Sequence, residues 1–115
     1  MKASANCYTK TNSPSTLQVV KNYYKGLETG TRELMQLHPD IMYINRNNKC
    51  MSSEDFFVTS WYLCGKKYRN RQIIISDNVA CVKYELKMPN GTASYCEWFT
   101  LEDGMIAIIE VFHGI

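Results

Sequence analysis

The segment that decides the fold is residues 79–88, VACVKYELKM, in which apolar and charged side chains alternate. Alternation with a period of two is typical of a β-strand that has one face on a core. The core face is then made of five side chains: Ala80, Val82, Tyr84, Leu86 and Met88. The opposite face carries Cys81, Lys83, Glu85 and Lys87.

Strong turn signals lie on both sides of this strand. Four β-type segments follow one another from Tyr68 onward, and they are separated by Asp77-Asn78, Pro89-Asn90-Gly91 and Asp103-Gly104. Short turns of this composition connect neighbouring antiparallel strands. The C-terminal half is therefore predicted to be an antiparallel meander.

The segment before the meander carries helix signals. Ser13 and Pro14 predict an N-cap and a first helical residue, while Ser15 and Gln18 form an alternative capping box. Apolar residues then recur at helical spacing up to Gly30, which is a typical C-terminal residue for a helix.

Two further helices are expected before the meander. One begins after Thr31 and ends at Pro39; the other begins with the capping sequence at residues 52–55 and ends at Gly65. A short β-type segment, residues 41–44, lies between them. This order predicts an α+β fold with three N-terminal helices packed on a strongly curved, mostly antiparallel sheet.

The chain length and composition fit one globular domain. The chain has 115 residues, a net charge of +2 and 45% hydrophobic residues. Residues 1–13 are polar and predict a loose tail, and residues 14–115 form the domain. No secretory signal or membrane span is recognised, so a cytoplasmic location without membrane partners is expected.

Metal, cofactor and nucleic-acid sites are not expected. The five cysteines include no C-x-x-C pair and have no histidine cluster beside them. The one basic cluster, residues 66–71, has little support from the net charge, so nucleic-acid binding is not predicted.

Three segments carry a resemblance to a known family: VVKNYY at residues 19–24, DIMYIN at 40–45 and EWFTLEDGMI at 97–106. Together with the element order, they resemble the nuclear-transport-factor-two-like (NTF2-like) superfamily, and most closely its SnoaL-like branch. Ketosteroid isomerases and limonene epoxide hydrolases are more distantly similar. The resemblance implies a cone-like α+β barrel that can hold an apolar ligand.

The resemblance also locates the catalytic positions of the two enzyme types. Tyr23 matches the helix-one tyrosine of the isomerases, but Asn45 stands where their basic aspartate would be. Tyr43 and Asn45 match residues that hold water in the epoxide hydrolases. The remaining hydrolase positions fall on Tyr84, Leu86 and Val111. The usual acid–base residues of both enzymes are therefore absent, and whether the chain is an enzyme stays open.

Three other titratable residues remain as catalytic candidates. They are Asp40, Glu97 and His113. Asp40 beside Pro39 also suits a turn, and Glu97 also suits an outer-face pair with Lys83.

The turns predict which residues face the interior. A two-residue turn at Asp103-Gly104 sets Trp98 opposite Ile109, and a bulge at Gly91 sets it opposite Val82, so both place Trp98 inward. A three-residue loop ending at Gly104 would shift the first pairing by one. The expected ligand pocket comprises Tyr23, Tyr43, Asn45, Trp61, Tyr84, Cys96, Trp98, Val111 and His113.

The last two strands are apolar on both faces. The outward set is expected to be Phe99, Leu101, Ile106, Ile108 and Phe112. An apolar outer face needs a cover, and a second copy of the chain is the simplest one. The sequence thus predicts a homodimer that binds a small, largely apolar molecule. The alternatives are an isomerase, dehydratase or hydrolase with a nonstandard acid–base residue, and a non-catalytic interaction module.

Overall fold

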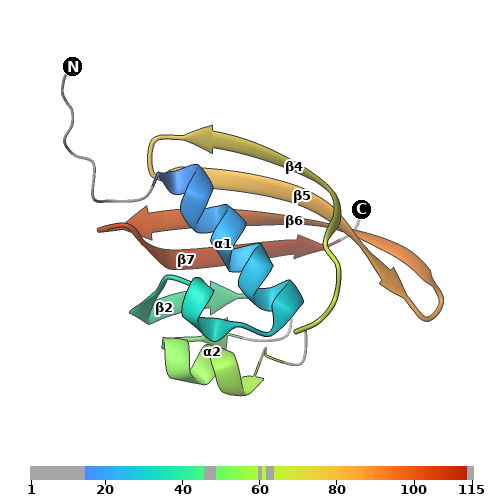
Figure 1. The fold of residues 1–115 in the computed structure, drawn as a ribbon, viewed down its shortest axis with the longest axis horizontal. Coiled ribbons are helices and arrows are strands. Elements are labelled where there is room, and N and C mark those ends of the chain that lie inside the picture. The colour runs from blue at the N-terminus through green and yellow to red at the C-terminus, as the bar shows by residue number, and fades with distance from the viewer. Residues whose placement is uncertain (1–14, 46–48, 60, 62–63, 114–115) are drawn as a thin grey trace.

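The computed structural model describes residues 15–45, 49–59, 61 and 64–113 (Figure 1). The predicted tail at residues 1–13, and a helix start at Ser13-Pro14, lie outside these residues. The first described helix, α1, spans Thr16–Thr29. The hydroxyl of Ser15 accepts the backbone N–H of Gln18 at 3.1 Å, and Gly30 ends the helix with a φ of 72°. The cap at Ser15 and the stop at Gly30 are therefore confirmed.

The prediction of three helices is wrong. The described residues contain two α-helices, α1 and α2 (Ser53–Thr59), and the short 3₁₀ turn η1 (Arg32–Leu34) follows α1. Strand β2 (Leu37–Ile44) already begins where the second helix was expected. Pro39 explains the difference, because a proline favours extended backbone at the residue before it.

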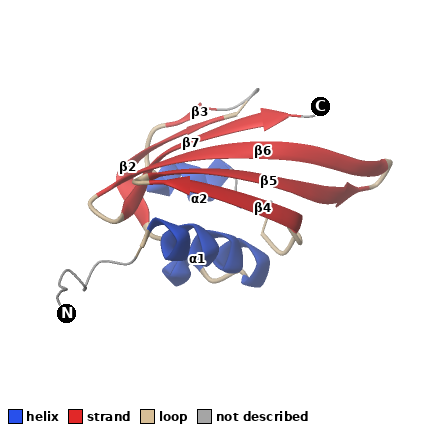
Figure 2. Ribbon diagram, turned by 90° about the horizontal axis from the view of Figure 1, so that it is seen from above, coloured by secondary structure: helices blue, strands red, loops and turns tan. Residues whose placement is uncertain are grey.

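All the described strands belong to one six-stranded sheet. Besides β2, its strands are β3 (Lys49–Cys50), β4 (Arg69–Ser76), β5 (Val79–Met88), β6 (Gly91–Glu102) and β7 (Met105–His113). Their spatial order is β3-β2-β7-β6-β5-β4, and only β2 and β7 pair in parallel. Both helices lie on one side of the sheet (Figure 2).

The sheet is curved but does not close into the expected barrel. Strands β3 and β4 form its two edges. The mostly antiparallel α+β arrangement is confirmed, and the four consecutive strands after Tyr68 form the predicted meander.

The register of β6 differs from the prediction at both of its ends. Met88 pairs directly with Gly91, so no bulge residue follows the Pro89-Asn90 turn. At the other end, Glu102 pairs with Met105 across the predicted two-residue turn, but Ala107 is an extra residue that shifts the pairing by one. A shift of one residue exchanges the two faces of a strand.

These two shifts exchange the predicted inward and outward faces only in β6 and in the first residues of β7. Phe99, Leu101 and Ile106 are buried in the core, so their predicted outward orientation is wrong. Trp98 and Cys96 lie on the uncovered face, so their predicted inward orientation is also wrong. Ile108 and Phe112 keep the outward side that was predicted for them.

Candidate functional site

The site with the clearest chemistry is a carboxyl group buried beneath α1. Glu97 lies in the middle of β6, paired with Val82 and Val111, and only 3% of its surface is exposed. The hydroxyl of Tyr24 on α1 donates a hydrogen bond of 2.5 Å to its Oε1. Glu97 was expected on the outer face beside Lys83, and the register of β6 corrects this.

The protein environment favours the protonated form of this carboxyl group. Burial raises the pKa of Glu97 from 4.5 to about 7, against the opposing effect of hydrogen bonds from Tyr24 and Tyr84. Burial and the nearby carboxylate also raise the pKa of the Tyr24 hydroxyl well above its ordinary value. Tyr24 is therefore a neutral hydrogen-bond donor to Glu97.

Aromatic rings surround the Tyr24–Glu97 pair. The ring of Tyr24 lies with its centroid 5.1 to 5.9 Å from those of four neighbours, Tyr23, Tyr68, Tyr84 and Phe99. Interplanar angles of 54° to 82° make these contacts tilted or edge-to-face, which is the favourable geometry for aromatic pairs. The cluster fills the space between α1 and the sheet.

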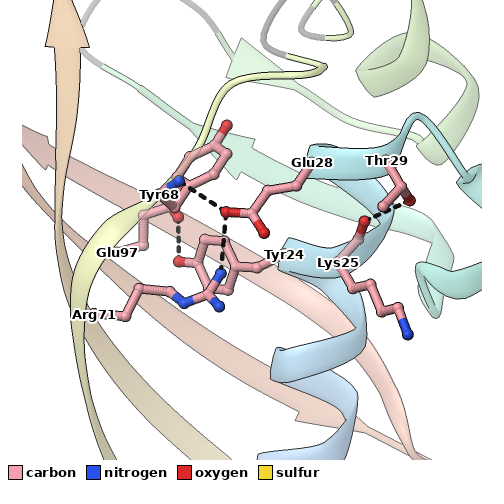
Figure 3. Close-up of polar contacts among 7 residues, drawn as sticks. All are labelled: Tyr24, Lys25, Glu28, Thr29, Tyr68, Arg71 and Glu97. Carbon is pink, nitrogen blue, oxygen red and sulfur yellow. Dashed lines mark hydrogen bonds and ion pairs between the residues drawn. The ribbon is translucent and has the colours of Figure 1, made fainter.

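A polar contact covers the outer side of Tyr24 (Figure 3). The Arg71 guanidinium carbon lies 5.2 Å from the centroid of the Tyr24 ring. Its Nη1 is 3.5 Å from Oε2 of Glu28, which also accepts the backbone N–H of Tyr68 at 2.8 Å. Glu28 and Arg71 therefore tie α1 to β4 directly above Tyr24.

A groove runs between α1 and β4 beside the Arg71–Glu28 contact. Its volume is about 600 Å³. It is lined by Gln18, Lys21, Asn22, Tyr24, Lys25 and Glu28 from α1, and by Arg71 and Ile73 from β4. Because Tyr24 belongs to both, the groove leads toward the buried carboxyl group.

A second, smaller pocket lies at the start of β4. Its volume is about 250 Å³, and it is lined by Lys66, Lys67, Arg69, Leu86 and Lys87. The fold thus adds Lys87 from β5 to the basic cluster seen in the sequence. The expectation of no nucleic-acid partner stays a prediction.

The predicted pocket residues are only partly brought together. Tyr23, Tyr43 and Tyr84 are buried core residues on the helix-covered side, and Val111 packs against the same core. They do not line either of the two pockets described above.

The other predicted pocket residues lie elsewhere. Trp61 packs against Phe57 with the ring centroids 5.3 Å apart, and Asn45 is half-buried after β2. Cys96 and Trp98 lie on the opposite side of the sheet from the tyrosines. The side chain of His113 lies outside the described part of the structure.

The remaining catalytic candidate, Asp40, is exposed on β2, where its backbone N–H donates to Nδ1 of His38 at 3.0 Å. Within the described ranges, no group of three histidine, cysteine or acidic side chains could hold a metal ion. No helix in the same ranges is long and apolar enough to cross a membrane.

Sequence reasoning missed Tyr24 and Arg71 as parts of this site. It assigned the helix-one hydroxyl to Tyr23, although both tyrosines are buried. An apolar stripe on a helix predicts burial but does not show which hydroxyl meets a carboxylate on a distant strand.

Comparison with known proteins identifies the fold. No protein-family model and no curated protein sequence matches the chain. Among solved structures, an NTF2-like protein of unknown function from Cytophaga hutchinsonii has 18% identity and a TM-score of 0.76, covering 90% of this chain and 93% of its own.

Two further neighbours have proposed activities. A proposed polyketide cyclase from Pseudomonas putida has 14% identity and a TM-score of 0.75, over 89% of this chain and 93% of its own. A proposed ketosteroid isomerase from Kribbella flavida has 13% identity and a TM-score of 0.77, over 93% and 83%. The chain therefore has the NTF2-like fold that its sequence predicted, with neighbours of the SnoaL-like kind.

Proposed function

We propose that the chain is a SnoaL-like small-molecule-binding domain whose ligand enters the groove between α1 and β4 and is bound by Tyr24 and Glu97. The buried hydrogen bond between these two residues is the observation that supports this function most strongly. When a ligand oxygen takes the place of the Glu97 oxygen as the acceptor of the Tyr24 hydroxyl, a protonated carboxyl group and a neutral phenol can both donate hydrogen bonds to that ligand oxygen.

Access to the pair requires the Arg71–Glu28 contact to open. Both side chains are partly exposed, at 33% and 26%. An ion pair at this exposure contributes roughly 0–1 kcal/mol, so its opening costs little. Tyr24 then becomes the floor of an accessible groove.

The ligand class follows from the groove and from the rings below it. In the groove, the Tyr24 ring and Ile73 favour a flat, apolar body, and the two hydrogen-bond donors favour a carbonyl, phenol or enolate oxygen. Lys21 and Lys25 on the rim favour a ligand that carries partial negative charge.

Native mass spectrometry of the freshly purified chain tests this function. A small mass that is lost under denaturing conditions would support it and would identify the ligand. For a chain without cargo, 2-naphthol is a suitable probe, titrated by its own fluorescence. We expect Tyr24→Phe to weaken its binding by about tenfold, which is the worth of one hydrogen bond, and Tyr23→Phe to leave binding unchanged. Equal binding by both variants would contradict the assignment.

An acid–base enzyme is the second possible function, and the pKa of Glu97, about 7, favours it. General acids and bases work best when their pKa lies near the working pH. The test is deuterium exchange at the α carbon of cyclohexanone in D₂O, followed by NMR. Exchange that Glu97→Gln abolishes would establish the enzyme, and exchange at the buffer rate would contradict it for this carbonyl class.

We further propose that the chain forms a homodimer through the uncovered face of the sheet. This face carries the exposed side chains Ile74, Trp98 and Phe112, at 72%, 43% and 52%. Ile108 lies on the same side, between Thr100 and Met42 of the neighbouring strands. Large exposed apolar side chains on a sheet face that also carries Lys83 and Glu110 favour a self-complementary interface over a free interaction module.

A further inference from the structure

Two cysteines meet on the uncovered face of the sheet. Cys81 on β5 lies opposite Trp98, and Cys96 on β6 lies opposite Lys83. The two cysteines are therefore diagonal neighbours on adjacent antiparallel strands. Their Sγ atoms are 3.1 Å apart, and both residues are half-buried thiols.

The two sulfur atoms are in non-bonded contact. A disulfide has an S–S length of about 2.05 Å, so the sulfurs need to approach by only about 1 Å. Side chains at diagonal positions on adjacent antiparallel strands usually lie farther apart, but here the two Sγ atoms are in contact.

We propose that Cys81 and Cys96 form a redox site, in which a small-molecule disulfide such as oxidised glutathione converts the two thiols to an intramolecular disulfide joining β5 to β6. One protein thiolate attacks oxidised glutathione, which forms a mixed disulfide and releases one glutathione thiol. The second protein thiolate then attacks the protein sulfur of the mixed disulfide and releases the second glutathione. The chain loses two hydrogens, and oxidised glutathione gains them.

The surroundings of the thiols set the conditions for this reaction. Burial and the contact with Cys81 raise the pKa of Cys96 to about 11; Glu97 adds to the rise, and Lys83 opposes it. Exchange proceeds through the thiolate, so it is faster at pH 9 than at pH 7. Because ionisation does not stabilise the reduced form, the disulfide resists reduction once it has formed.

Oxidation of the two cysteines affects the uncovered face of the sheet, because of where the pair lies. Trp98 pairs with Cys81, and Phe112 pairs with Cys96, so the two cysteines lie among the most exposed apolar side chains of the sheet. Oxidised glutathione reaches the pair in the free monomer, before a second copy covers this face. The disulfide then fixes the arrangement of β5 and β6 on the face that carries these side chains.

The experiment incubates the full chain with oxidised glutathione at pH 8 and then alkylates the remaining thiols. Intact mass under non-reducing conditions, followed by peptide mapping, gives the products. We expect a loss of two hydrogens and a linked pair of peptides that contain Cys81 and Cys96. Cys81→Ser and Cys96→Ser should each abolish this loss and retain a glutathione adduct on the remaining cysteine.

Cys64→Ser is the matched control, because Cys64 is also half-buried but lies beside Gly30 at the end of α1. This variant should lose two hydrogens as the wild type does. The proposal is wrong if the wild type gives only glutathione adducts, unmodified thiols or disulfides between two chains. It is also wrong if the loss of two hydrogens persists in Cys81→Ser.

Discussion

The hydroxyl of Tyr24 meets Oε1 of Glu97 at 2.5 Å across 73 residues of sequence. This contact joins the middle of α1 to the middle of β6. Glu97 is the one charged residue among the buried side chains of the described chain, and aromatic rings enclose it. Its position explains why an acidic residue is tolerated in this core, because Tyr24 provides the donor that a buried carboxyl group needs.

The first prediction concerns the pH dependence of stability. The pKa of Glu97 is about 7 in the folded chain, against 4.5 ordinarily, so the folded state binds the proton more tightly than the unfolded state. The stabilisation is complete below about pH 4.5 and is lost as the pH rises to about 7. The shift corresponds to about 3 kcal/mol of unfolding free energy.

Urea unfolding of the wild type and Glu97→Gln between pH 4.5 and 8 measures this effect. The glutamine variant has no proton to lose at this position, so the difference between the two curves isolates Glu97. We expect the wild type to lose stability relative to the variant as the pH rises. Parallel curves would show that the carboxyl group ionises normally.

The second prediction concerns the coupling between Tyr24 and Glu97. Removing the hydroxyl with Tyr24→Phe leaves the buried carboxyl group without this donor, at a cost of about 1–3 kcal/mol. The loss should be larger at pH 8 than at pH 5, because the carboxylate needs the donor more than the neutral acid does. Urea unfolding of the wild type and Tyr24→Phe at pH 5 and at pH 8 measures the loss of unfolding free energy at each pH.

A double-mutant cycle with Glu97→Gln separates the contact from general packing. Tyr23→Phe is the matched control, since Tyr23 is an equally buried neighbour on α1. The loss of unfolding free energy in Tyr23→Phe should be independent of pH. Because a glutamine oxygen can still accept the Tyr24 hydroxyl, the cycle measures the extra strength of the bond to the carboxyl group, and additive effects would contradict that extra strength.

The sequence predicted much of the fold because the relevant signals are local. The alternation in β5, the cap at Ser15 and the stop at Gly30 each depend on a few neighbouring residues. Strand β6 has apolar residues on both faces, so its own pattern does not indicate which face is buried. Its register depends on one residue at the Pro89 turn and one at Ala107. Small differences in turn geometry therefore exchanged the buried and the uncovered face along the whole of β6.

The candidate site was harder to predict than the fold. Lys83 and Glu97 lie on adjacent strands, and opposite charges there usually indicate an exposed pair. The structure instead pairs Glu97 with Val82 and turns it toward α1. Only the long-range contact with Tyr24 makes its burial favourable, and no local sequence pattern encodes that contact.

The third prediction concerns the uncovered face. If a second copy covers it, Ile108→Asp places a charge in an apolar interface and should give a monomer or insoluble protein. Native mass spectrometry and light scattering measure the assembly. Val58→Asp is the matched control, because Val58 is 78% exposed and lies on α2 on the other side of the sheet. A wild-type monomer, or an Ile108→Asp dimer as stable as the wild type, would contradict this interface.

The fourth prediction concerns a glycine inside α1. Helix propensity alone predicts that Gly26→Ala stabilises the chain by roughly 0.5–1 kcal/mol. A Cβ at this position, however, would lie 2.5 Å from Cγ of Met35 and 2.8 Å from the backbone oxygen of Thr31. The backbone contact cannot yield as a side chain can, so η1 must move away from α1. Overpacking of this kind costs about 1–3 kcal/mol, and we expect net destabilisation.

Urea unfolding of Gly26→Ala measures this outcome, with Lys25→Ala on the exposed side of the same helix as the control. The control should stay within about 0.5 kcal/mol of the wild type, as surface substitutions usually do. Because Met35 packs on Gly26, adding Met35→Ala should relieve the clash of the side chain but not the clash with Thr31. The double variant should therefore recover little of the lost stability. A Gly26→Ala chain as stable as the wild type would show that η1 moves freely, and that the close packing of α1 on η1 does not hold this end of the fold together.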